Sequence, residues 1–374
     1  MDQVAFYSVK NYHVAHAGIL QALQLGGFRP VLLVRDNHKS AQKDGQRVFA
    51  ASSELVPAGI LSSRIWQRDS KSAYLREVPR IFPLLLLFFR WRPTLTLVYE
   101  RGVRTSVVAF IAFLFRSKVI QVLDAPTLRW KPEKNPWALP NLWLRYLMTP
   151  KRRMHSGGLG TMHGERVSLG PLLGTSTLAP YPVSVPEHYR AVRTPRLPLR
   201  VICVAGSNHR RTNFPFVLTS LGDVVRNHSV DLTFLVWPLY AESQTREIRS
   251  VEKQMSLGRI GIQRGVQASH FQAFLQNFDV MIYSSSRSSY GHAVSVALSC
   301  GIPVVCSRGV GARVLIREGQ NGFLFNPHEM GELSRAIASL AQSLSQCEKL
   351  SLGALRLSEQ NFSLSAWLDA ANAL

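Results

Sequence analysis

Short apolar runs alternate with helix-like segments along the first half of the chain. Apolar residues stand together at 4–9, 31–34, 95–99 and 119–123, whereas residues 15–26 and 106–115 have the spacing of helices. Gly26 and Gly27 end the first of these helical segments. Continuous apolar runs of this length are typical of strands buried on both faces, and their alternation with helices predicts a parallel sheet.

The same alternation begins again in the second half. Strands are expected at residues 200–206, 232–237, 278–283 and 302–306, with a helix at 214–226. The halves are separated by a segment with four prolines, which favours a linker: Pro182, Pro186, Pro195 and Pro198. We therefore predict two Rossmann-like α/β domains, residues 1–194 and 195–360, followed by an amphipathic helix at 361–374.

Residues 290–305 predict an anion site. They read Tyr-Gly-His-Ala-Val-Ser-Val-Ala-Leu-Ser-Cys-Gly-Ile-Pro-Val-Val, which is a glycine-led helix start, a turn at Cys300-Gly301 and a buried strand. Glycine at a helix start lets a ligand approach backbone N–H groups that have no acceptor inside the helix. The helix dipole favours negative charge at the same point, so we expect this segment to hold a diphosphate.

This string, with Gly309-Val-Gly311 and the later Glu-Gly-Gln-Asn-Gly at 318–322, resembles the donor-binding half of GT-B glycosyltransferases, especially glycosyltransferase family 4. The resemblance is specific over about residues 199–340 and loose before them. It implies a GT-B fold, in which two Rossmann-like domains face a cleft and the last helix crosses back to the first domain. It also implies transfer of a sugar from a nucleotide-sugar donor, with retention of anomeric configuration and without a metal.

A basic loop follows the first strand of the second half. The family has Gly-Arg-x-x-x-x-Lys-Gly here, and its basic pair neutralises the donor diphosphate. In this chain Ser207 stands at the Arg position, and Arg210 or Arg211 takes the place of the Lys. The guanidinium fork suits phosphate oxygens, so we interpret this loop as a phosphate site. A solvated basic loop is the alternative.

The two glutamates that contact donor sugar and ribose in the family are replaced by Ser288 and Val296. A valine side chain accepts no hydrogen bond, and a serine carries no charge. Tyr290, Gly291 and His292 remain beside the expected sugar pocket, although His292 also suits a helix cap. The missing glutamates motivate a second hypothesis, a non-catalytic GT-B subunit that binds a partner glycosyltransferase or the membrane.

Candidate residues of the first domain follow its strands. Residues just past the carboxyl ends of parallel strands face the ligand crevice. After the first strand we select His13 as catalytic, with Lys10 and Asn11 on the acceptor side. Asp124 follows the strand at 119–123, as a ligand of the acceptor hydroxyl or as a base, and Glu100 is a weaker candidate. The alternatives are a structural turn for the first loop and a capping role for Asp124.

The charge balance indicates phosphate-bearing partners. The chain of 374 residues has 44 Lys and Arg against 23 Asp and Glu, a formal net charge of +21. Residues 76–92 and 130–153 combine Trp, Phe and Leu with Arg and Lys, which suits the interface of an anionic membrane. The charge also motivates a nucleic-acid binder, but no recognised binding motif accompanies it, so we rank that last.

The apolar runs, the N-terminal residues and the cysteines bear on the cellular compartment of the protein. Neither apolar run, 81–89 or 107–115, approaches the roughly 20 residues of a membrane-spanning helix, and residues 1–10 resemble a strand rather than a secretory signal. The four cysteines lack metal-ligand spacing and indicate a reducing compartment, and no metal or cofactor is expected.

We therefore expect a cytoplasmic glycosyltransferase, peripheral on the inner face of the membrane. It would transfer a sugar from a nucleotide sugar to a lipid-linked or polysaccharide acceptor in cell-surface glycan synthesis. A sugar-nucleotide epimerase of the same fold is a further alternative, because fold does not settle function.

Overall fold

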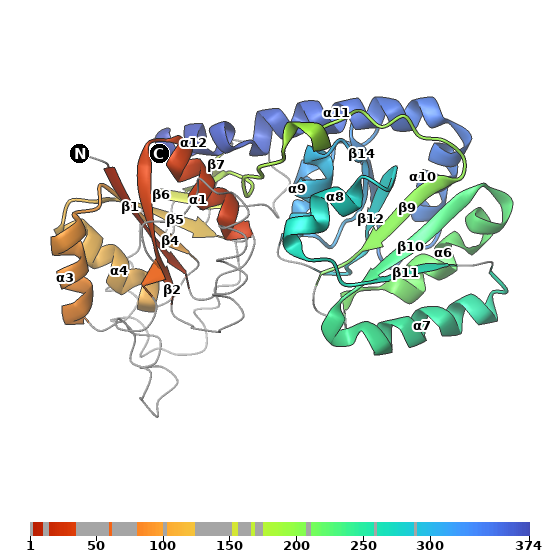
Figure 1. Cartoon of the computed structure of the whole chain (residues 1–374), viewed down its shortest axis with the longest axis horizontal. Helices are drawn as coiled ribbons and strands as arrows, with labels where there is room; N and C mark the ends of the chain where they lie inside the picture. Colours follow the sequence, from red (N-terminus) through yellow and green to blue (C-terminus); the bar gives the residue numbers. More distant parts are fainter. Residues whose placement is uncertain are drawn as a thin grey trace. The chain divides into compact units, whose positions relative to one another are not determined.

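The structure is a computed structural model that describes residues 3–9, 15–34, 60–61, 81–99, 103–123, 152–155, 166–168, 175–206, 211–257, 260–287 and 290–374. The chain divides into two compact units. The first contains Met1–Ser156, Thr161–Pro182 and Leu364–Leu374, and the second contains Gly157–Gly160 and Val183–Ser363 (Figure 1). The division at 182/183 lies upstream of the linker boundary expected at 194/195, and the chain returns to the first unit at Leu364.

The first unit is built around one sheet. Its strand order is β3-β2-β1-β4-β5-β6-β8-β7, and the pairs are parallel except for β7 with β8. The strands are β1 (Gln3–Val9), β2 (Phe28–Val34), β3 (Ile60–Leu61), β4 (Leu95–Tyr99), β5 (Lys118–Leu123), β6 (Arg152–His155), β7 (Arg166–Ser168) and β8 (Thr175–Leu178). Its helices are α1 (Ala15–Leu25), α3 (Ile81–Trp91), α4 (Val103–Leu114) and α12 (Leu364–Asn372).

Side chains of the central strands form the core of this unit. Every residue of β4 is buried, as expected for a strand covered on both faces. Phe6 on β1 contacts Phe88 on α3 edge to face, with ring centroids 4.9 Å apart. Residues of α4, including Val108 and Ile111, complete the same cluster. Helices α3 and α4 therefore lie against one face of the sheet.

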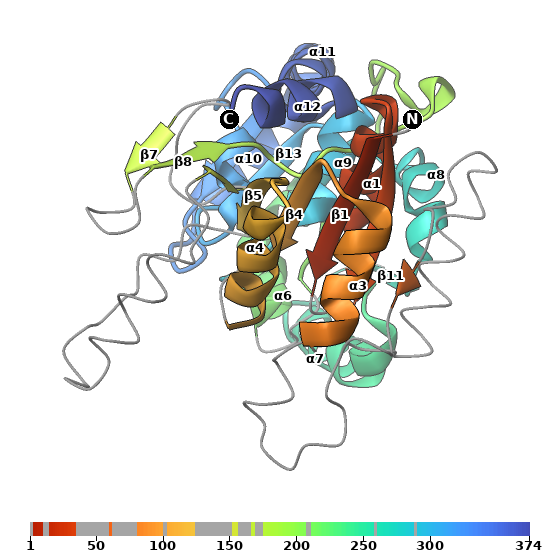
Figure 2. The same cartoon turned by 90° about the vertical axis from the view of Figure 1, so that its left-hand side faces the viewer.

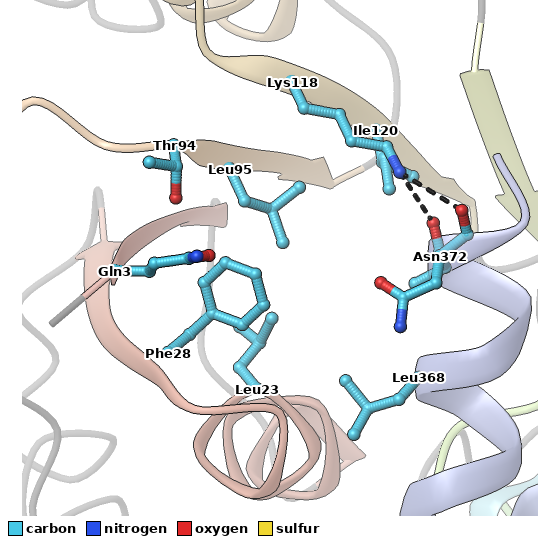
Figure 3. A pocket seen from close by; sticks show the side chains of 10 residues that line it. Gln3, Leu23, Phe28, Thr94, Leu95, Lys118, Ile120, Leu368 and Asn372 are labelled. Carbon is cyan, nitrogen blue, oxygen red and sulfur yellow. Dashed lines mark hydrogen bonds between the residues drawn. The ribbon is translucent and has the colours of Figure 1, made fainter.

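The last helix, α12, packs on the first unit beside α1. Lys118 Nζ donates hydrogen bonds of 3.3 and 3.5 Å to the carbonyl oxygens of Ala371 and Asn372, where the helix ends (Figure 3). A cation at a helix C-terminus stabilises the unsatisfied carbonyls. Burial, and then the neighbouring Arg152, lower the pKa of Lys118. A pocket between Leu95, Ile120 and Leu368 lies next to this contact.

The second unit has a fully parallel sheet in the order β11-β10-β9-β12-β13-β14. The strands are β9 (Leu199–Val204), β10 (Val230–Val236), β11 (Gly261–Arg264), β12 (Val280–Tyr283), β13 (Val304–Ser307) and β14 (Gly322–Phe325). Its helices are α6 (Phe214–Asn227), α7 (Ala241–Gln254), α8 (Phe271–Leu275), α9 (His292–Ser299), α10 (Glu332–Gln342) and α11 (Leu344–Phe362). In each unit the first six strands have the order 3-2-1-4-5-6 of doubly wound Rossmann folds, which confirms the expected fold class.

An ion pair joins the starts of β9 and β12. Arg200 donates to both carboxylate oxygens of Asp279, at 3.1 Å from Nε and 2.8 Å from Nη2, and its backbone N–H donates to the same group. The carboxylate is almost fully buried, and its hydrogen bond raises the pKa of Arg200. These contacts anchor the two strands whose opposite ends form the candidate site.

Among the described residues, no helix is both long and apolar enough to cross a bilayer.

The four cysteines are buried and should not react in the native protein. Burial raises the pKa of Cys203, Cys300 and Cys347 to about 12 and also raises the pKa of Cys306. Because the thiolate is the reactive form, almost none is present at a pH of about 8. We expect Ellman's reagent to detect no thiol in the native chain and all four after unfolding in guanidinium chloride. A native thiol that reacts within minutes would contradict the buried placement.

Candidate functional site

The strand order of the second unit places two loops side by side. Strands β9 and β12 are parallel neighbours, with Val204 opposite Tyr283 in the register. Strand β10, which follows β9 in the sequence, lies on one side of this pair, and β13, which follows β12, lies on the other side. The direction in which successive strands are added across the sheet therefore reverses between β9 and β12. In open α/β sheets, ligands bind outside the carboxyl ends of the strands at such a switch point. The segments after Val204 and after Tyr283 are therefore the candidate site.

Serines after β12 connect these two loops. The Gly206 N–H donates to Ser285 Oγ at 2.7 Å, and the Ser286 N–H donates to the Arg211 carbonyl oxygen at 2.9 Å. Ser284 Oγ donates to the Thr212 carbonyl oxygen at 2.5 Å. Sequence reasoning did not select these residues, although three consecutive serines directly after a buried strand are a visible signal. They hold the basic loop against the end of β12.

Gly291 is the N-cap of α9, so the helix start is led by glycine, as the sequence predicts. Its φ of 96° lies in the left-handed region of backbone conformation, which residues other than glycine rarely adopt. A Cβ atom there would lie 2.7 Å from Val310 Cγ1 and 3.2 Å from the Tyr283 ring. The position therefore requires glycine for both its conformation and its space. It opens the N-terminus of a helix at the end of β12, where the dipole favours an anion.

Tyr290, the residue before Gly291, contacts α9 and the segment that follows β13. Its side chain is buried, its hydroxyl is hydrogen-bonded to Ser295 Oγ, and its carbonyl oxygen accepts the Ala312 N–H at 2.6 Å. His292, the first residue of α9, is half-buried, and its ring centroid lies 6.4 Å from that of Tyr290. Donor contact by either residue stays a prediction.

Val296 is buried in α9. The position where the family has a ribose-binding glutamate is therefore part of the apolar packing of this helix. Two carboxylates of the second unit hold backbone groups: Glu318 Oε1 accepts the Leu324 N–H at 3.1 Å, and Glu332 Oε2 accepts the Asn326 N–H at 2.7 Å.

The Glu-Gly-Gln-Asn-Gly string forms a turn before β14. Asn321 Oδ1 accepts the Arg317 N–H, and Asn321 Nδ2 donates to the Leu315 carbonyl oxygen, both at 2.8 Å. A Cβ on Gly322 would lie 2.0 Å from the Val304 carbonyl oxygen. This part of the motif therefore shapes the edge of the sheet.

Arg211 is the described member of the basic pair. Its backbone carbonyl oxygen accepts a hydrogen bond from the Ser286 N–H, while its side chain is exposed. Asn213 follows in a left-handed conformation, with φ at 60°, and donates from Nδ2 to the Pro327 carbonyl oxygen at 3.0 Å. Helix α6 begins directly after it. An exposed guanidinium thus lies three residues before the first residue of α6, at the edge expected to bind phosphate.

The other predicted site residues lie outside the described residues: Lys10, Asn11, His13, Glu100, Asp124, Ser207, Arg210 and Ser288. In the first unit, β1, β4 and β5 are parallel neighbours, so the carboxyl ends of these strands lie at the same edge of the sheet.

A buried polar cluster that sequence reasoning missed lies at this edge of the first unit. Tyr7 Oη and His16 Nδ1 are 2.7 Å apart, and Tyr181 Oη donates to Tyr99 Oη at 3.1 Å. The His16 ring contacts the Tyr99 ring edge to face, with centroids 4.6 Å apart. The signal was present in the sequence, since His16 is the second histidine of the segment at 10–16.

In the part of the chain that the structure describes, no group of three or more His, Cys, Asp or Glu side chains is placed to hold a metal ion.

Comparison with known proteins finds a family match within the second unit. Residues 197–354 match the family model "Glycosyl transferases group 1". A D-inositol 3-phosphate glycosyltransferase of Thermomonospora curvata is 30% identical over 78 residues. That segment is 21% of this chain and spans only 18% of the relative's length.

Two solved structures share the fold over nearly the whole chain. Anabaena Alr3699/HepE in complex with UDP has a TM-score of 0.70 at 13% identity and covers 99% of both chains. A glycosyltransferase of Rickettsia africae has a TM-score of 0.70 at 12% identity, covering 100% of this chain and 97% of that one. The chain thus has the GT-B fold, and its residues 197–354 are similar to the glycosyl transferases group 1 family.

Proposed function

We propose that this protein is a glycosyltransferase that moves a sugar from a nucleotide-sugar donor to a hydroxyl of a lipid-linked or polysaccharide acceptor. The observation that carries the proposal is the switch point of the second unit. There the Arg211 loop, the three serines after β12 and the glycine-led start of α9 meet at one sheet edge. The family match covers these same residues.

In the proposed reaction, the bond between the sugar C1 and the donor diphosphate breaks while the acceptor oxygen bonds to C1. Arg210, Arg211 and the first N–H groups of α9 would stabilise the negative charge that develops on the leaving diphosphate. Preorganised donors of this kind contribute most of the rate enhancement in many enzymes. Asp124 or His13 would take the proton of the acceptor hydroxyl. We propose retention of configuration without a metal, at the cytoplasmic face of a membrane during cell-surface glycan synthesis.

Nucleotide binding tests the donor site directly. We expect UDP to stabilise the purified chain, with GDP, ADP, dTDP and CMP as parallel ligands, because the structural neighbour HepE was solved with UDP. A ligand at about a hundred times its dissociation constant adds about 2.7 kcal/mol to the free energy of unfolding. The measurement is thermal unfolding with each nucleotide. Unfolding curves unchanged by all five would contradict a working donor site.

A non-catalytic subunit is the second candidate. It is favoured by Val296, which is buried where the family has its ribose-binding carboxylate. This candidate predicts a folded chain without nucleotide stabilisation that co-purifies with a partner glycosyltransferase. Nucleotide-dependent stabilisation with sugar transfer to an added acceptor would exclude it, and sugar interconversion without an acceptor would indicate an epimerase.

A further inference from the structure

Two helices of the first unit expose large apolar side chains. Phe82 and Phe89 on α3 are 71% and 64% exposed, and Phe113 on α4 is 73% exposed. Four further apolar residues of these helices are also exposed: Ile81, Leu86, Phe110 and Leu114. A monomeric soluble protein seldom exposes large apolar side chains in a group, and such groups mark interaction surfaces.

Each helix is apolar on two opposite faces. In α3, Leu84 and Phe88 are buried one turn apart, while Phe82, Leu86 and Phe89 lie on the other side. In α4, Val108, Ile111 and Ala112 are buried, whereas Phe110, Phe113 and Leu114 are exposed. A surface helix normally carries polar residues opposite its buried stripe. The core of the unit therefore does not account for the exposed apolar residues of these helices.

The two exposed faces belong to one surface. Helices α3 and α4 lie side by side in Figure 2, and they are in direct contact. Phe88 of α3 packs near Phe115 just after α4, with ring centroids 5.6 Å apart. We call the exposed apolar residues of the two helices the α3–α4 face: Ile81, Phe82, Leu86, Phe89, Phe110, Phe113 and Leu114.

Arginines border the α3–α4 face. Arg92 lies over the Phe89 ring at 5.7 Å, and Arg29 lies over the Trp91 ring at 5.3 Å. Arg90 and Arg116 add two exposed cations next to the same helices. Residues 81–99 and 103–123 contain no Asp or Glu. Cations beside aromatic rings, in segments that contain no carboxylate, suit a membrane surface in which lipid phosphates lie above apolar acyl chains.

We propose that the α3–α4 face docks the first unit onto an anionic lipid bilayer. The Phe and Leu side chains would enter the boundary between head groups and acyl chains, and the arginines would bind lipid phosphates. The sequence predicted membrane contact for residues 76–92, and the tertiary structure adds α4 to the same surface. The inference rests on the membrane part of the proposed function and does not require sugar transfer.

Vesicle binding by the full chain, without nucleotide, tests the docking. The probes are sedimenting vesicles of phosphatidylcholine alone or with about 30% phosphatidylglycerol. We compare the wild-type chain with Phe82→Ser/Phe113→Ser. The matched control is Leu25→Ser/Met330→Ser, which removes apolar side chains that are 62% and 66% exposed elsewhere. All four positions are exposed, so neither variant disturbs the core.

We expect the wild-type chain and the control to bind the anionic vesicles and to be released by salt, because exposed ionic contacts are screened. Phe82→Ser/Phe113→Ser should partition about tenfold more weakly. Equal binding by both variants would overturn the assignment of the face, and equal binding to neutral and anionic vesicles would overturn its lipid specificity.

Two further readouts separate the competing explanations. Light scattering that detects a dimer, abolished in Phe82→Ser/Phe113→Ser, would identify the face as a contact between two copies and overturn lipid docking. UDP stabilisation measured on the same samples reports the donor site independently. If UDP did not stabilise the wild-type chain, that result would count against the transferase but would not affect the vesicle result.

Discussion

The variant Arg210→Ala/Arg211→Ala should turn over about 100-fold more slowly than the wild-type chain while it unfolds at the same temperature. The physical reason is the charge on the leaving diphosphate, which grows as the bond to the sugar breaks. Removal of one preorganised donor at such a centre typically costs about 100- to 1,000-fold in kcat. Stability should be unchanged because the Arg211 side chain is exposed and its fixed contact is made by the backbone. The measurement is sugar transfer at saturating nucleotide sugar, with thermal unfolding in parallel.

A matched control separates local charge from overall charge. Arg246→Ala/Lys253→Ala removes two exposed cations from α7 in the same unit. We expect this variant to keep its kcat, because exposed charges that do not contact the diphosphate are weakened by salt screening at physiological ionic strength. If both double variants lost activity equally, the basic pair would act only through net charge. Unchanged kinetics in Arg210→Ala/Arg211→Ala would remove the pair from the site.

Gly309→Ala should destabilise the chain by about 3 kcal/mol and weaken UDP binding more than about tenfold. A Cβ at this position would lie 1.9 Å from the carbonyl oxygen of Ser286. The added Cβ and the carbonyl oxygen are both attached directly to the backbone, so no side-chain rotation can relieve the contact. The backbone after β13 or at Ser286 must therefore move. The Ser286 N–H holds the Arg211 carbonyl oxygen, and the displacement therefore reaches the basic loop. Urea unfolding and titration calorimetry with UDP measure the two effects.

Gly319→Ala is the control for the glycine substitution. Gly319 has φ at 74°, but no heavy atom lies within 4 Å of its Cβ position. It should lose only about 1–2 kcal/mol, from the left-handed conformation, and keep its affinity for UDP. Equal losses of stability and affinity in the two variants would show that close packing at Gly309 does not position the site.

Local patterns predicted the elements that carry a strong periodicity. Residues 15–26 were expected to form a helix ended by glycine, and α1 spans Ala15–Leu25 with Gly27 at φ 78°. The strand expected at 95–99 is β4. Three short strands on one side of the first sheet, β6, β7 and β8, escaped prediction. Strands of three or four residues carry too little pattern, and their pairing depends on neighbours distant in the sequence.

The site was predicted in part. The glycine-led start of α9 was recognised because Gly291 and the Cys300-Gly301 turn follow a local rule that links residue type to backbone conformation. Ser284, Ser285 and Ser286 were missed, since their role consists of hydrogen bonds to residues more than 70 positions earlier in the chain. His16 was missed for the same reason, because its tyrosine partners come from three separate segments of the first unit.

The sequence alone determined two Rossmann-like sheets, the glycine-led helix start and the resemblance to GT-B glycosyltransferases. These follow from periodicity and residue type within a few positions of each other. Only the tertiary structure decided that β9 and β12 are neighbours, that the serines tie the Arg211 loop, and that α3 and α4 share one exposed apolar face. Those relations join residues far apart along the chain, and no local pattern encodes which distant segment a strand or helix packs against.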